Sequence, residues 1–439
     1  MKRWLVILLI VLAVIILVSP GIVGRLAEKS VEENLEFATG ESDEFVVTTE
    51  RFERGWFTSE GRHRIELREG TIRSTIEEGL GRQAGVPSLI IDTHVDHGLV
   101  PVTSMSRDAG SLKPGLASTV STMRLDPGNG ELIEMPGRVY SEVGLTGVTT
   151  SRFLLEAGSR SFDHITAEWQ GADILVKTNL QTGMVSVKGE VKRWSVGRDH
   201  GALRIGAIEF EGTREHSRYG FGVGDIRMTV VALELDSNLG ITTGFDSLSI
   251  DASSEIDGDR VNAASTFEIS GVTTPGFGDI GVTMDVVLGG LDARSFQDIV
   301  QFLRTVGGSA DPESALVSTY PAVEAELHRF LAAGAEIRLD RLDVTLPDGE
   351  VTTKFRFSLP PADPDAEFSW PGLLLALDAS AHIRLPVALF DMAQAATPEA
   401  ATLVAMGFFR KDGDSYEMQA EYAKGLLTVN GAPMPVPLP

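Results

Sequence analysis

An alternation of apolar and polar residues with a period of two constrains the fold of this chain most, and it dominates from about residue 40 to about residue 290. Between residues 282 and 288, for example, every second residue is apolar, and 261–269 holds a similar run. Side chains of a β-strand point alternately to opposite faces, so each run predicts a strand with one apolar face. Clusters of Gly, Asp and Asn separate the runs, which predicts a meander of antiparallel strands and not βαβ units.

The period changes after Gly289-Gly290, where apolar residues begin to recur at helical spacing. In the C-terminal third the sequence predicts amphipathic helices over 292–306, from 312 to 334 with an interruption at Pro321, over 387–396, and from 397 to about 409. Strands are predicted between these helices, over 335–346, 351–359 and 373–385. The expected fold class is therefore α+β, with a large, mostly antiparallel sheet and C-terminal helices.

The N-terminus carries a long apolar stretch, from Trp4 to Val18, whose apolar character continues to Gly24. About twenty residues of helix span ~30 Å, the thickness of the hydrocarbon core of a bilayer. Lys2 and Arg3 precede the stretch, so the positive-inside rule predicts a cytoplasmic N-terminus and an exported body. A cleaved signal peptide is the alternative, but the apolar stretch is long for one. We expect an uncleaved single-pass anchor that attaches the protein to the membrane through residues 4–24.

These patterns predict four segments along the chain. Residues 1–24 form the transmembrane anchor and 25–37 a helical stalk. Residues 38–290 form a β-rich extracytoplasmic region, and 291–439 an α+β region that completes the same body. We see neither a clean linker nor a repeat of fixed length.

Composition excludes several classes of function. The formal net charge of −24 opposes nucleic-acid binding, and the absence of cysteine excludes thiol catalysis and cysteine-ligated metals. The closest approach to a metal cluster is His94-Val95-Asp96-His97, in which His94 and Asp96 share one face of a strand while His97 takes the other. No nucleophile elbow, zinc-protease motif or phosphate loop occurs. We therefore expect no metal, no cofactor and no catalytic residue.

The longest alternation supplies a candidate ligand face, formed by Leu373, Leu375, Leu377, Ile383 and Leu385. A sheet of about a dozen strands would be ~58 Å wide, and four helices ~10 Å across would leave part of its apolar face uncovered. Curling of the sheet or a second sheet would make that face an internal core. An open groove that holds lipid acyl chains is the other possibility, and the sequence leaves both open.

The densest aromatic patch lies in residues 51–59, where Gly55 precedes Trp56 and Phe57. These aromatics could mark the membrane interface or a binding site. We favour a structural interpretation, in which Gly55 permits a bend or bulge between paired strands and Trp56 packs inside.

Three short motifs together resemble the YdgA-like family of bacterial envelope proteins, a domain of unknown function. The motifs are Gly55-Trp56-Phe57 with Ser59, Asp96-His97-Gly98, and the C-terminal turn at Asn430-Gly431. The resemblance runs the full length of the chain. It implies an anchor in the bacterial inner membrane with a β-rich periplasmic body, and it implies no catalytic residues.

The sequence thus predicts a non-enzymatic, membrane-anchored periplasmic protein of the cell envelope that binds or passes lipid along an apolar sheet face. A periplasmic scaffold that binds another envelope protein through a strand edge or an apolar patch is the alternative. An envelope hydrolase is the third hypothesis, without a nucleophile that can be named.

Overall fold

The structure is a computed structural model that describes residues 45–67, 88–98, 115–126, 132–162, 165–179, 181–198, 201–236, 242–274, 278–307, 312–362, 369–396 and 399–434. Within these ranges no helix is both long and apolar enough to cross a membrane. The predicted anchor over residues 4–24 and the predicted stalk over 25–37 lie outside the described residues.

Antiparallel strands account for most of the described chain, as the period-two alternation predicts. The chain divides into two compact units. Unit 1 comprises residues 1–158, 170–191 and 308–310, and unit 2 comprises 159–169, 192–307 and 311–439. Residue 290, where the period of the sequence changes, lies in unit 2 within the strand β17 (Gly278–Asp292).

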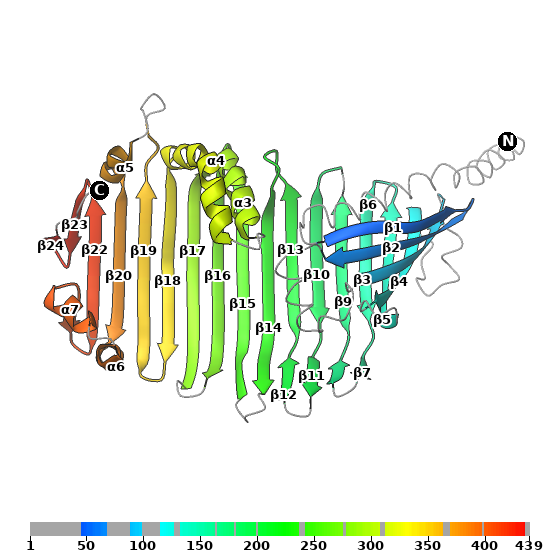
Figure 1. The fold of residues 1–439 in the computed structure, drawn as a ribbon, viewed down its shortest axis with the longest axis horizontal. Coiled ribbons are helices and arrows are strands. Elements are labelled where there is room, and N and C mark those ends of the chain that lie inside the picture. Colours follow the sequence, from blue (N-terminus) through cyan, green and yellow to red (C-terminus); the bar gives the residue numbers. More distant parts are fainter. Residues whose placement is uncertain are drawn as a thin grey trace, which may run out of the picture. The chain divides into compact units, whose positions relative to one another are not determined.

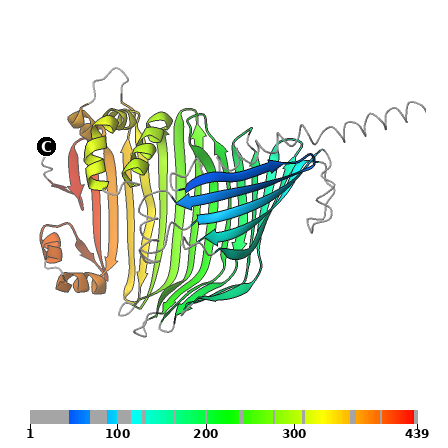
Figure 2. The same cartoon turned by 45° about the vertical axis from the view of Figure 1, so that its right-hand side comes forward.

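Unit 1 is an antiparallel sheet in which β1 to β6 pair in chain order, followed by β9 and β10. Its strands are β1 (Phe45–Arg54), β2 (Thr58–Leu67), β3 (Ser88–His97), β4 (Gly115–Asp126), β5 (Ile133–Gly144), β6 (Val148–Leu155), β9 (Ala172–Asn179) and β10 (Met184–Val191). Figure 2 shows that this sheet curves strongly along the series from β1 to β6. One sheet face carries a small core of Val95, Ala117 and Val143, against which Leu116 packs.

Unit 2 contains the longest strands of the chain, among them β14, β15, β16 and β17 (Figure 1). Its strands are β7 (Gly158–Phe162), which starts at the boundary, β8 (Ile165–Trp169), β11 (Trp194–Arg198), β12 (Gly201–Ile205), β13 (Ile208–His216), β14 (Gly222–Asp236), β15 (Thr242–Asp257), β16 (Arg260–Thr274), β17, β18 (Ala335–Leu346), β19 (Gly349–Leu359), β20 (Asp378–Pro386), β21 (Arg410–Asp412), β22 (Ser415–Ala423), β23 (Leu426–Val429) and β24 (Ala432–Met434). From β13 to β20 they pair in chain order, and β22 then pairs with β20.

Five helices are described in unit 2, and they lie at or near the ends of its strands (Figure 1). They are α3 (Ala293–Gly307), α4 (Pro312–Ala332), α5 (Trp370–Ala376), α6 (Val387–Ala396) and α7 (Glu399–Ala405). The helices predicted over 292–306 and 387–396 are confirmed to within a residue. The Asp292 carboxylate accepts a hydrogen bond of 3.0 Å from the Ser295 backbone N–H, which caps the start of α3.

The main core of unit 2 lies where α3 and α4 pack on the sheet. Val261, Leu291, Ala293 and Ala335 are buried there, and the flanking side chains include Phe296 of α3 and Phe330 of α4. The helices therefore cover one end of the sheet face, close to the start of β16 and the end of β17.

Two predicted elements of the C-terminal third are wrong. Helix α4 runs through Pro321 without the expected interruption, although a proline in a helix interior costs ~3 kcal/mol, and tertiary contacts such as that of Phe330 with the core act against this local cost. The strand predicted over 373–385 is helical up to Ala376, because Ser369 and Pro371 form a helix start. The Ser369 hydroxyl accepts a hydrogen bond from the Gly372 N–H, and proline fits the first helical turn.

Candidate functional site

An apolar row of side chains crosses the sheet of unit 2 from β13 to β22. The register places one residue of each strand directly beside a residue of the next strand, and these residues all point to the same face of the sheet. The row consists of Phe210, Met228, Ile250, Phe267, Met284, Leu342, Thr353, Ile383 and Met418. With ~4.8 Å between strands, it is ~38 Å long. We call this row and the parallel rows beside it the apolar face.

The apolar face is covered only in part. Every member of the row is half-buried, whereas fully buried side chains of the same face, such as Val261, lie near α3 and α4. In two parallel rows of this face, Phe355 is 40% exposed and Ile337 is 38% exposed. A packed protein core would bury such side chains almost completely. The described helices thus leave much of the apolar face open to an occupant.

The opposite face of the same sheet is polar and internally paired. Arg227 on β14 forms ion pairs with Asp251 on β15, at 2.8 Å, and with Glu211 on β13, at 3.6 Å. Arg341 on β18 lies 3.2 Å from Asp285 on β17. Such cross-strand pairs satisfy the charges of a solvated face. The two faces of the sheet therefore differ sharply in chemistry.

The candidate ligand residues from the sequence fall into two groups. Ile383 and Leu385 lie on β20 and belong to the apolar face, where they pair with Met418 and Tyr416 of β22. Leu373 and Leu375 lie in α5, and Leu377 is its C-cap residue, so these three do not continue the strand pattern.

The candidate ligand face predicted from the sequence did not include the part of the apolar face on β13 to β18. Each of those strands shows the alternation, for instance Met284 and Val286 in β17. The alternation does not say which residues of neighbouring strands lie side by side, since that depends on register. A search for apolar residues that stay in phase across successive runs could have found the face.

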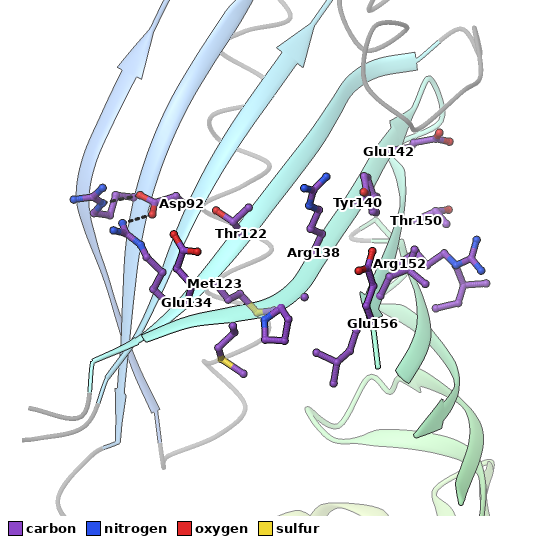
Figure 3. A pocket seen from close by; sticks show the side chains of 18 residues that line it. Asp92, Thr122, Met123, Glu134, Arg138, Tyr140, Glu142, Thr150, Arg152 and Glu156 are labelled. Atoms are coloured by element: carbon purple, nitrogen blue, oxygen red, sulfur yellow. Dashed lines mark hydrogen bonds and ion pairs between the residues drawn. The ribbon is translucent and has the colours of Figure 1, made fainter. Parts of the chain in front are cut away.

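A second concave feature lies entirely within unit 1. It is a polar groove of about 1310 Å³ between β2, β3, β4, β5, β6 and β9, and Figure 3 shows the side chains that line it. Asp92 of β3 binds two arginines there, Arg62 at 2.7 Å and Arg124. Arg138 of β5 points into the groove, exposed and without a hydrogen bond to another described side chain.

The chemistry of the polar groove is that of a paired, solvated surface. Arg152 donates to both carboxylate oxygens of Asp173, at 2.8 Å and 2.5 Å, and this contact raises the pKa of the arginine. Among the described residues no group of three or more His, Asp or Glu side chains is arranged to hold a metal ion. Hydroxyl groups of Thr122, Tyr140 and Thr150 also line the groove.

The first two sequence motifs meet at one edge of unit 1. The backbone N–H of His97 donates to the Phe57 carbonyl at 2.9 Å, and the Ser59 hydroxyl shares a hydrogen bond of 3.1 Å with Nε2 of His97. Ser59 and His97 are both 2% exposed. His94 and Asp96 lie on the other face of β3, with Nε2 and Oδ1 3.4 Å apart, as the strand parity predicts. The motifs thus fix the turn between β1 and β2.

The sequence predicts that Trp56 packs inside the protein, and this prediction is wrong. It is 57% exposed and Phe57 is 47% exposed, so Trp56 does not pack inside. Gly55 does form the expected bend, because its N–H donates to the Thr58 carbonyl at 2.7 Å. A Cβ on Gly55 would lie 2.8 Å from that oxygen, which explains why glycine stands there.

The third motif is a structural turn between β23 and β24. Asn430 and Gly431 both adopt positive φ, 50° and 78°. The Asn430 amide donates to the carbonyls of Gly407, at 2.9 Å, and Phe408, at 3.0 Å. These bonds hold the chain after α7 against the C-terminal strands, so the motif supports the fold.

Comparison with known proteins identifies the family of the chain. The model of a family described as "Bacterial protein of unknown function (DUF945)" matches residues 1–437, so the chain belongs to that family. No curated protein matches the chain. No solved structure matches it either.

Proposed function

We propose that this member of the DUF945 family is a non-enzymatic protein of the bacterial cell envelope that binds lipid acyl chains along the apolar face of unit 2. We further propose that the family is the YdgA-like family that the motifs resemble. In this proposal residues 4–24 anchor the chain in the inner membrane, the N-terminus is cytoplasmic, and the body is periplasmic.

One observation carries the proposal: the row crosses the sheet from β13 to β22, is apolar at every position except Thr353, and is half-buried along its whole length. An acyl chain that fills one leaflet of a ~30 Å hydrocarbon core is ~15 Å long. The ~38 Å row therefore has room for two such chains end to end. Each methylene moved from water onto this face contributes up to ~0.8 kcal/mol, so a lipid gains affinity without any polar recognition.

The polar face of the same sheet supports this arrangement. Its ion pairs, such as Arg227 with Asp251, keep one side of the sheet hydrated. A sheet with one hydrated face and one apolar face can lie between water and lipid, because the charged side chains on the hydrated face are paired or solvated. Nothing in this role requires a catalytic group.

Photocrosslinking in cells tests the proposal on the full chain. Cells would incorporate a diazirine-bearing fatty acid into their phospholipids, and crosslinked peptides of the purified protein would be mapped by mass spectrometry. We expect lipid adducts on peptides from β14 to β20 in addition to the anchor. Adducts confined to residues 1–37 would refute lipid binding by the apolar face while leaving the anchor in place.

A protein occupant of the same face is the second candidate function. Phe355 and Ile337 are exposed next to the apolar row, and exposed apolar patches often mark protein interfaces. In that case crosslinking should recover one dominant envelope protein and no lipid.

A further inference from the structure

The turn between β1 and β2 presents two large aromatic side chains to solvent. Trp56 and Phe57 are 57% and 47% exposed and adjacent in sequence. Their backbone is fixed by the bond from Gly55 to Thr58 and by the bond from the His97 N–H to the Phe57 carbonyl. We call residues 55–57 the aromatic tip. The backbone hydrogen bonds and the buried pair of Ser59 and His97 hold this turn in place, so the aromatic tip is exposed on an ordered turn.

A further exposed apolar side chain lies at the same edge of unit 1. The register pairs Thr58 with Asp96 and Gly115 with Gly144, so the β1–β2 turn and the β5–β6 turn end at one edge of the sheet. Leu145 in the second turn is 56% exposed. This edge thus offers apolar side chains from two separate turns.

The area of the aromatic tip argues against a protein partner. A Trp or Phe side chain buries ~150–250 Å² in all, so about half of two such side chains is ~200 Å². A stable protein interface needs ~800 Å² on each partner, with matching shape. A bilayer needs no shape complementarity, and tryptophan is enriched at the level of the lipid headgroups.

The chain length allows the aromatic tip to return to a membrane. The segment from Gly24 to Phe45 can span at most ~70 Å when fully extended. Strand β1 is ten residues long, about 34 Å. A tip at the far end of β1 therefore lies within reach of the bilayer that holds residues 4–24.

From these observations we infer that Trp56 and Phe57 dock unit 1 on the interfacial layer of a phospholipid bilayer. The inference rests on the membrane attachment proposed above and not on lipid binding by the apolar face. Docking holds unit 1 at the membrane surface by inserting the aromatic side chains among the headgroups.

Brominated lipids test this inference, because bromine quenches tryptophan fluorescence only at short range. The full chain would be placed in nanodiscs of phosphatidylcholine with or without brominated acyl chains. The chain has five tryptophans, so the signal of Trp56 is the difference between wild type and Trp56→Phe. Trp194 on β11, 36% exposed, gives a matched difference from Trp194→Phe.

We expect the Trp56 signal to be blue-shifted in plain discs and mostly lost in brominated discs, while the Trp194 signal persists. An unquenched Trp56 signal in a protein that co-purifies with discs would overturn docking and leave the anchor intact. Equal quenching of both signals would also overturn it, because it would indicate general proximity to lipid. A protein that fails to associate with discs overturns both the anchor and the docking. Lipid binding by the apolar face is read separately, from the crosslinked peptides of β14 to β20.

Discussion

Replacing Ile383 by aspartate places a carboxylate in the apolar row, one strand from its β22 end. Ile383 lies on β20 between Thr353 and Met418 and is half-buried. Full burial of an isoleucine is worth up to ~3 kcal/mol, so contact with an acyl chain adds about half of that, ~1.5 kcal/mol. A carboxylate facing the chain costs at least ~2 kcal/mol more. The sum of ~3.5 kcal/mol corresponds to about 300-fold weaker lipid binding.

The same substitution should leave the protein folded. Aspartate is unfavourable in a strand by up to ~1 kcal/mol, and the half-buried contacts of Ile383 contribute ~1.5 kcal/mol. A loss of ~2.5 kcal/mol is smaller than the 5–15 kcal/mol, roughly, that stabilise a typical domain. Ser380→Asp is the matched control, since Ser380 lies on the same strand, is exposed, and pairs with Arg356 and Glu421 on the polar face.

Native mass spectrometry of residues 38–439, purified from the periplasm without detergent, measures the outcome. We expect an adduct of phospholipid mass on wild type and on Ser380→Asp, and its loss from Ile383→Asp. An adduct that survives Ile383→Asp undiminished would refute the assignment of the apolar face as the lipid site. A wild-type protein without any adduct would favour the protein-binding alternative.

Further predictions concern strands β1 to β3 of unit 1. Ser59→Ala removes a buried hydrogen bond to His97 and should lower the free energy of unfolding in urea by about 1–3 kcal/mol, whereas Ser380→Ala should change it by less than about 0.5 kcal/mol. Gly55→Ala should cost about 1–2 kcal/mol through the contact with the Thr58 carbonyl, and a neutral result would show that the turn can relax. Burial lowers the pKa of His63, so the unfolded chain takes up the proton first as the pH falls below about 6.5. Its contribution to stability is therefore complete above about pH 6.5 and is lost as the pH falls toward the lower pKa of the folded state, and His63→Gln should flatten the fall in Tm over that range.

The sequence predicts those elements whose periodicity is unambiguous. Helix α3 follows from apolar residues at i, i+3, i+4 and i+7, and the strands of unit 2 follow from period-two alternation. The alternation predicts one strand from Leu373 to Leu385, but the helix start at Ser369 and Pro371 makes the segment helical up to Ala376. In such a short segment, the hydrogen bonds of the helix cap determine whether the chain forms a helix or a strand.

The sequence predicts that the candidate site is apolar, but it does not predict that the site is exposed. Alternation in β20 shows that a strand has an apolar face, but an internal core and an exposed ligand face give the same alternation. The difference depends on which elements cover the sheet, and this is a long-range property. The exposure of Trp56 escaped prediction for a related reason, since a bend at Gly55 can direct the next side chain to either face.

Phe355 offers a direct way to identify what covers the apolar face. It lies on β19 between Leu339 and Ala381, and at 40% exposure it is among the most accessible large side chains of that face. Benzoylphenylalanine at this position keeps the aromatic ring and adds a photoreactive group that reaches only direct neighbours. Lipid occupancy predicts an adduct of phospholipid mass after irradiation in cells, and a scaffold role predicts one discrete protein adduct. An adduct of twice the mass of the chain would mean that two copies cover each other, and it would contradict both proposals. The same residue placed at Ser380, on the polar face, should give no adduct in any of the three cases.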